Sequence, residues 1–160
     1  MVQSDLAGGE LVDFAPRSGW IDMNESDHFV QFYETDDFLL NSLGDFIGTG
    51  LSAGDSSIVV ARRARREGLA ERLRTCGLDV DAASASGQYL SLDAAETLSQ
   101  FMVDGQPEPL RFAEVIGDVI TRAAQGGQRV RIFGEMVALL GEEGNHAAAI
   151  RLEELWNELS

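Results

Sequence analysis

The sequence predicts an α/β fold: a three-layer sandwich with a mostly parallel central sheet of at least four strands and helices on both faces. Two observations support this class. Short apolar runs alternate with longer segments in which apolar residues recur every three or four positions, the spacing of amphipathic helices. The connections between successive runs are also long enough to hold crossover helices, which join parallel strands with right-handed geometry.

Four runs have the composition of strands. The first, at 28–33, is aromatic and β-branched, and the second, "SSIVVA" at 56–61, has the pattern of a continuously buried parallel strand. The third, at 87–93, alternates apolar and polar residues. The fourth is the short run at 129–133.

Helical patterns fill the connections. The first helix is expected to begin at Thr35, which is a suitable N-cap, and to end at the glycines of residues 48–54. The residues before 27 show no sustained period, so residues 1–26 are predicted to be a mobile arm and residues 27–160 a single domain. The remaining helices are expected at 62–76, 93–105, 110–127, from Glu135 to about Leu140, and from Asn145 to the end.

The composition excludes several classes of function. The chain carries 27 acidic and 12 basic residues, a net charge of −15, so its surface repels nucleic acid and anionic lipid. All the basic residues are arginines, which removes every mechanism that needs a lysine. One cysteine, Cys76, and two histidines favour neither a disulfide nor a metal site. No apolar run approaches the roughly 20 residues of a membrane span, and a cytoplasmic protein is expected.

The first strand-to-helix turn argues against an ATPase. A phosphate-binding loop needs glycines, whose amides wrap the phosphates, and a lysine. Here the turn reads "YETDDF" at 33–38, with three acids in those places. There is also no G-x-S-x-G elbow, and no catalytic residue, cofactor or metal is predicted.

Candidate ligand-binding residues lie where the strands end. In open parallel sheets, ligands bind off the carboxyl ends of the strands. Gly134 and Glu135 follow the fourth strand, and Tyr33 ends the first, so Glu135 and Tyr33 are the first candidates. The alternatives are that Glu135 only caps a helix and that Tyr33 is a core residue. His28 opens the first strand, where a structural role is the competing interpretation.

Two apolar groups have open roles. Met136, with Met102, Phe101 and Phe133, either lines a cavity for a hydrocarbon or fills the core. The final helix carries an apolar stripe that either docks on the sheet or binds a partner, with a homodimer as one form of partner. The stripe comprises Leu152, Leu155, Trp156 and Leu159.

The chain as a whole resembles the MEDS domain, the methanogen/methylotroph DcmR-like sensory domain. The resemblance covers about residues 27 to 160 and is carried by three motifs: His-x4-Tyr at His28 and Tyr33, the "GLSAGD" turn ending at Asp55, and "R-x2-GEM" from Arg131 to Met136. It implies a RecA/KaiC-like α/β core without a nucleotide loop. It also implies a pocket formed by His28, Tyr33, Arg131 and Glu135 that accepts a hydrocarbon derivative.

The function expected from these observations is a non-enzymatic small-molecule sensory domain that passes its signal to a histidine kinase or a transcription regulator. Two alternatives remain open. One is a protein-interaction module without a small ligand, and the other is a degenerate domain that still binds a nucleotide.

Overall fold

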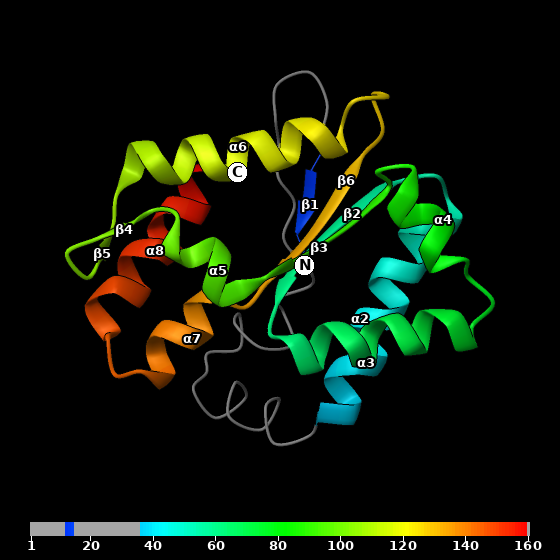
Figure 1. Cartoon of the computed structure of the whole chain (residues 1–160), viewed down its shortest axis with the longest axis horizontal. Coiled ribbons are helices and arrows are strands. Elements are labelled where there is room, and N and C mark those ends of the chain that lie inside the picture. Colours follow the sequence, from blue (N-terminus) through cyan, green and yellow to red (C-terminus); the bar gives the residue numbers. More distant parts are fainter. Residues whose placement is uncertain (1–11, 15–35, 160) are drawn as a thin grey trace.

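The computed structural model describes residues 12–14 and 36–159, and Figure 1 shows the arrangement of their helices and strands. Three of the predicted strands form within these residues: β2 (Ser56–Ala61), β3 (Tyr89–Asp93) and β6 (Val130–Gly134). The predicted first strand at 28–33, with His28 and Tyr33, lies outside the described residues.

The sheet is parallel. β2 lies between β3 and β6, with Ala61 opposite Asp93 and Val60 opposite Gly134. A three-residue strand, β1 (Val12–Phe14), pairs in parallel with the other side of β6 and falls in the segment predicted as an arm. The mixed α/β class and a parallel sheet of three of the predicted strands are therefore confirmed.

Seven helices and a short hairpin accompany the sheet in the described residues, and the last two helices follow its final strand, β6. The last helix begins as predicted, because the side chain of Asn145 accepts a hydrogen bond from the amide of Ala148 and caps it. The helices are α2 (Asp36–Ser52), α3 (Arg63–Thr75), α4 (Val80–Ala85), α5 (Ala94–Ser99), α6 (Pro109–Ala123), α7 (Met136–Glu142) and α8 (His146–Leu159), and the hairpin is β4 (Met102–Val103) with β5 (Gln106–Pro107).

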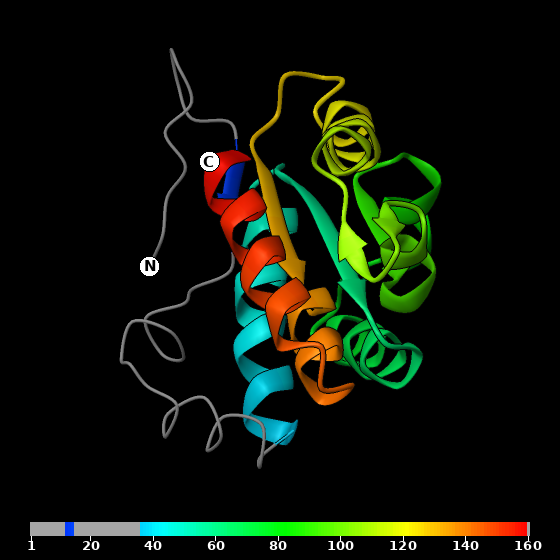
Figure 2. The same cartoon turned by 90° about the vertical axis from the view of Figure 1, so that its left-hand side faces the viewer.

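Apolar side chains alternate between the two faces of the sheet. Ile58 and Val60 of β2 pack with α5, α6, α7 and α8, whereas Val59 and Ala61 pack with α2, α3 and α4. Figure 1 shows the two groups of helices on opposite sides of the sheet, and Figure 2 looks onto the side where α8 lies in front. Both faces of β2 are covered, which explains why residues 58–61 are all apolar and why the two serines before them are buried as well.

The first helix ends within the predicted segment, 48–54, but after the first two glycines of that segment. α2 continues past Gly48 and Gly50 to Ser52, and the chain turns only at Gly54, whose φ is +92°. Gly50 allows a close contact: a Cβ there would stand 2.5 Å from Cδ of Arg131. The absence of a side chain at Gly50 therefore lets Arg131 of β6 pack against α2 without interrupting the helix.

The helix predicted over 93–105 is too long. α5 ends at Ser99, and the β4–β5 hairpin follows, turning at Asp104 (φ 51°) and Gly105 (φ 79°). An Asp-Gly pair with positive φ at both residues is typical of a two-residue hairpin turn. The Asp-Gly turn therefore determines the structure of this segment, although its apolar residues have helical spacing.

Tyr89 makes the stability of the fold sensitive to alkaline pH. Its side chain is buried on β3, and its hydroxyl has no hydrogen-bond partner among the described residues. Burial raises the pKa of Tyr89 from its usual value of 10.0 to about 12, and the charges of Arg66 and Arg74 oppose the rise. The pKa of Tyr89 is higher in the folded than in the unfolded protein. The protonated phenol therefore contributes fully to the free energy of unfolding below pH 10, and this contribution is lost as the pH rises toward 12.

We expect urea unfolding to show a loss of about 2 kcal/mol across this window in the wild type. Tyr89→Phe should remove most of that loss and leave stability at neutral pH unchanged or slightly higher, because no unpaired hydroxyl is then buried. Equal alkaline losses in the two proteins would contradict the assignment.

Candidate functional site

The ends of three strands meet at one rim of the sheet. The parallel register places the carboxyl ends of β2, β3 and β6 side by side, and the amide of Glu135 donates to the carbonyl of Val60 at 2.9 Å. Arg62, Asp93 and Glu135, which follow or end these strands, therefore lie close together, as the strand exits predicted.

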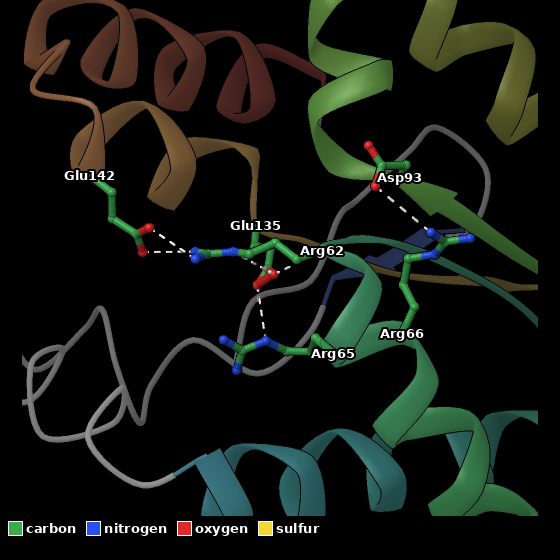
Figure 3. Close-up of polar contacts among 6 residues, drawn as sticks. All are labelled: Arg62, Arg65, Arg66, Asp93, Glu135 and Glu142. Carbon is green, nitrogen blue, oxygen red and sulfur yellow. Dashed lines mark hydrogen bonds and ion pairs between the residues drawn. The ribbon is translucent and has the colours of Figure 1, made fainter.

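Glu135 is the buried centre of this rim, with 1 % of its surface exposed. Its Oε2 accepts a hydrogen bond from the backbone amide of Arg62 at 3.0 Å and lies 3.2 Å from Nε of the same arginine. Its Oε1 lies 3.0 Å from Nε of Arg65. Figure 3 shows the two arginine side chains approaching the carboxylate from different directions. A carboxylate this deeply buried needs such pairing, because desolvation of an isolated charge is costly.

The start of α3 explains why both arginines reach the same carboxylate. Arg62 precedes the helix and Arg65 stands in its first turn, so three positions separate them and they share one side. This first turn contains no acidic residue, and Arg62 provides no side-chain cap. Glu135 supplies the missing negative charge from the position after β6, and the amino end of a helix favours such a charge.

Arg62 also joins the rim to α7. Its Nη1 and Nη2 donate to the two carboxylate oxygens of Glu142 at 2.9 and 2.7 Å, a bidentate arrangement at the end of that helix. The Arg62 side chain is 34 % exposed, so this is the solvent-facing part of the cluster. One guanidinium therefore contacts a carboxylate at each end of α7.

A second, looser group lies at the end of β3. Nε of Arg66 donates to the hydroxyl of Ser91 at 3.0 Å, and its Nη1 lies 3.8 Å from Oδ1 of Asp93. Asp93 in turn caps α5 by accepting the amide of Glu96 at 2.9 Å. Figure 3 shows Arg66 pointing toward Asp93, away from Glu135.

The described part of the rim is balanced in charge. Arg62, Arg65 and Arg66 stand against three carboxylates, those of Asp93, Glu135 and Glu142. The acidic turn that argues against a triphosphate, at 33–38, falls where side chains are not described. The described rim thus offers guanidinium groups as well as acids to a ligand.

The structure does not bring Arg131 to Glu135. Arg131 lies opposite Ser57, near the start of β6, where its Nε contacts Asp55 at 3.2 Å and its Nη1 donates to the carbonyl of Phe46 at 2.8 Å. It ties the last part of α2 to the amino end of the sheet. The motif that contains both residues therefore spans the strand from one end to the other.

Met136 is packed in the core. It belongs to the apolar cluster on the α5–α8 face, whereas Phe133 belongs to the cluster on the opposite face. The two side chains therefore do not line a common cavity.

The stripe on α8 packs within the molecule. Leu152 and Leu155 are buried in the core, and Leu159 packs against it. The ring of Trp156 meets that of Phe112 edge-on, 5.3 Å between centroids, and its Cζ2 would be 3.6 Å from a Cβ at Gly134. Trp156 thus connects α8 to the rim beside Glu135. Of the two roles considered for the stripe, docking on the chain's own core accounts for these contacts.

Two residues of the cluster were missed by sequence reasoning. Arg65 belongs to the arginine-rich helix, but nothing in its spacing distinguishes it from its neighbours. Glu142 adjoins Glu143, and a pair of adjacent acids gave no reason to choose one. Their partners lie 70 and 80 residues away, so only the fold reveals the pairing.

Over residues 12–14 and 36–159, no group of three acidic, histidine or cysteine side chains is arranged to hold a metal ion. Nor is any helix in these ranges both long and apolar enough to cross a membrane.

The fold and the rim define a mixed α/β domain with a cluster of buried and exposed ion pairs at the strand exits. The family model of the MEDS domain, the methanogen/methylotroph DcmR sensory domain, matches residues 27–160, and the chain belongs to this family. Membership indicates a sensory role. Comparisons with curated proteins and with solved structures gave no match.

Proposed function

We propose that this domain is a non-enzymatic receptor for a small molecule, which binds at the strand-exit rim and changes how α7 and α8 pack. The observation that carries the proposal is the pairing of buried Glu135 with Arg62 and Arg65 at the point where parallel sheets bind their ligands.

Glu135 has a positioning role in this proposal. Its side chain is covered, so a ligand meets the guanidinium groups around it before it meets the carboxylate. Arg62 is the most suitable contact, because part of its side chain is exposed and its other partner, Glu142, is a surface group. Surface ion pairs contribute only about 0–1 kcal/mol, so a ligand can replace this one.

The route of the signal follows from the contacts of Arg62 and Trp156. A ligand that engages Arg62 competes with Glu142 and loosens the end of α7. α8 packs against α7, and Trp156 lies over Gly134 beside the same rim. A ligand that favours one of two arrangements of these helices shifts their populations, which a histidine kinase or a transcription regulator can detect.

Isothermal titration tests the proposal. The probes are methanol, formate, chloroform and chloroacetate, which represent one-carbon and chlorinated compounds, together with ATP. The variants are Arg62→Gln and, as a matched control, Arg151→Gln, because the Arg151 side chain is similarly exposed (37 %) and pairs with acids on α8. We expect at least one of the first four probes to bind the wild type and the control, and to bind Arg62→Gln at least about tenfold more weakly.

Two results would overturn this proposal. If none of the first four compounds binds, the domain is not a receptor for these compounds. If a compound binds wild type and Arg62→Gln equally, its site is not at Arg62. Binding of ATP alone would favour the degenerate nucleotide-binding alternative, which the guanidinium groups of the rim keep open.

The finer architecture is also part of this proposal. Together with the strand predicted at 28–33, the described core would form a three-layer, RecA/KaiC-like sandwich without a working nucleotide loop. In that arrangement His28 and Tyr33 would complete the pocket.

A further inference from the structure

Within residues 12–14 and 36–159, the strand β3 is an edge of the sheet. It pairs with β2 on one side, and the described residues place no strand on its other side. All six residues of β2 are buried, whereas four of the five residues of β3 are only half-buried. An edge strand presents unpaired amide and carbonyl groups, to which an extended chain can add as a further strand.

A groove runs beside this edge, between α3 and β3. Its volume is about 390 Å³. Its lining is mostly charged and comprises Arg63, Arg66, Glu67, Ala70, Glu71 and Arg74 of α3 and Ser91 of β3. A lining of charged side chains does not suit an apolar small molecule, because small-molecule pockets are mostly apolar.

The charge of α3 is opposite to that of the rest of the protein. Residues 62–74 contain six arginines and two glutamates, within a chain whose net charge is −15. The ion pairs made by the outer arginines are exposed: Arg63 contacts Glu67 at 2.9 Å, and Arg74 contacts Asp81 at 3.5 Å. Exposed pairs are weak, so carboxylates of a partner can replace them.

We propose that the groove between α3 and β3 binds an extended, acidic segment of a partner protein, which adds to β3 as an edge strand and places its carboxylates against Arg63 and Arg74. The edge explains why the segment is extended, and the arginines explain why it is acidic. A second copy of this chain fits less well, because pairing β3 with itself would bring two arginine-rich helices together.

This surface adjoins the strand-exit rim but does not depend on a ligand there. Arg66 lies in both, since it lines the groove and contacts Asp93 at the rim. Arg63 and Arg74 belong to the groove and take no part in the cluster around Glu135. The two proposals therefore succeed or fail separately.

Fluorescence anisotropy with the full chain tests the assignment. The probe is a labelled peptide of four Glu-Val repeats, compared with a peptide of Lys-Val repeats and with a copy of the acidic peptide N-methylated at alternate backbone positions. We expect the acidic peptide alone to bind, and raised salt to weaken it. N-methylation should abolish binding, because it removes the amide groups that pair with an edge strand.

The variants locate the peptide. Arg63→Glu/Arg74→Glu should weaken binding at least about tenfold, whereas Arg111→Glu/Arg122→Glu, an equal change of charge at exposed positions on α6, should not. Circular dichroism confirms that each variant is folded. Failure of the acidic peptide to bind, equal binding of the N-methylated peptide, or equal losses in both variants would overturn the proposal. A dimer in sedimentation that Arg63→Glu/Arg74→Glu alters would instead assign the surface to a second copy.

Discussion

Replacement of Glu135 by alanine is expected to lower the free energy of unfolding by about 3–5 kcal/mol. The carboxylate is buried between two guanidinium groups and accepts the amide of Arg62. The substitution removes the negative charge from this covered site and leaves the positive charges in place. Loss of one partner from a buried ion pair costs far more than the net contribution of the pair.

Urea unfolding at neutral pH measures this effect, and two further variants separate its causes. Glu135→Gln keeps the shape and one acceptor but removes the charge, so an intermediate loss is expected. Glu142→Ala removes an exposed partner of the same arginine and should cost at most about 1 kcal/mol. If Glu135→Ala costs no more than Glu142→Ala, Glu135 does not organise the rim.

Replacement of Phe112 by alanine is expected to cost about 3–5 kcal/mol and to loosen α8. The buried ring of Phe112 meets Phe101 edge-on at 5.2 Å and Trp156 at 5.3 Å between centroids. Its removal leaves a cavity and takes away two aromatic contacts. Because Trp156 connects α8 to the rim, the variant also tests whether the position of this helix depends on the aromatic cluster.

Two measurements check this prediction. Urea unfolding gives the loss of stability, with Leu110→Ala as the control on the same helix, where 75 % exposure predicts a change within about 0.5 kcal/mol. Tryptophan emission, recorded in a Trp20→Phe background so that only Trp156 contributes, should shift to longer wavelength in Phe112→Ala. An unchanged emission with a stability loss below about 1 kcal/mol would show that the ring does not hold α8 in place.

Much of the described sheet could be predicted from the sequence, because buried parallel strands leave a clear signal. The run at 56–61 has four consecutive apolar residues after two serines, and the strand β2 has the same bounds. Glu135 could be predicted to lie at the rim, because it follows such a run and the carboxyl ends of parallel strands share one edge. For these residues, the structure expected from the local sequence pattern is the one found in the sheet.

The partners of Glu135 could not be predicted, because they depend on the packing of distant segments. The amide of Arg62 lies 73 residues away in the sequence. The motif shared by Arg131 and Glu135 suggested a common site, but a strand advances about 3.3 Å per residue and the two residues fall near opposite ends of β6. The end of α2 could be predicted only to the segment 48–54, because the sequence does not show that Arg131 packs against Gly50 and that the helix continues past this glycine.

Binding of a small ligand at the strand-exit rim is tested most directly by amide NMR shifts during titration with methanol, formate, chloroform or chloroacetate. We predict that the largest shifts cluster at the carboxyl ends of the strands, at residues 61–66, 93–96 and 134–137. Shifts centred on Asp55, Gln88 and Arg129 at the amino ends, or no shifts with any of the four compounds, would contradict binding at this rim.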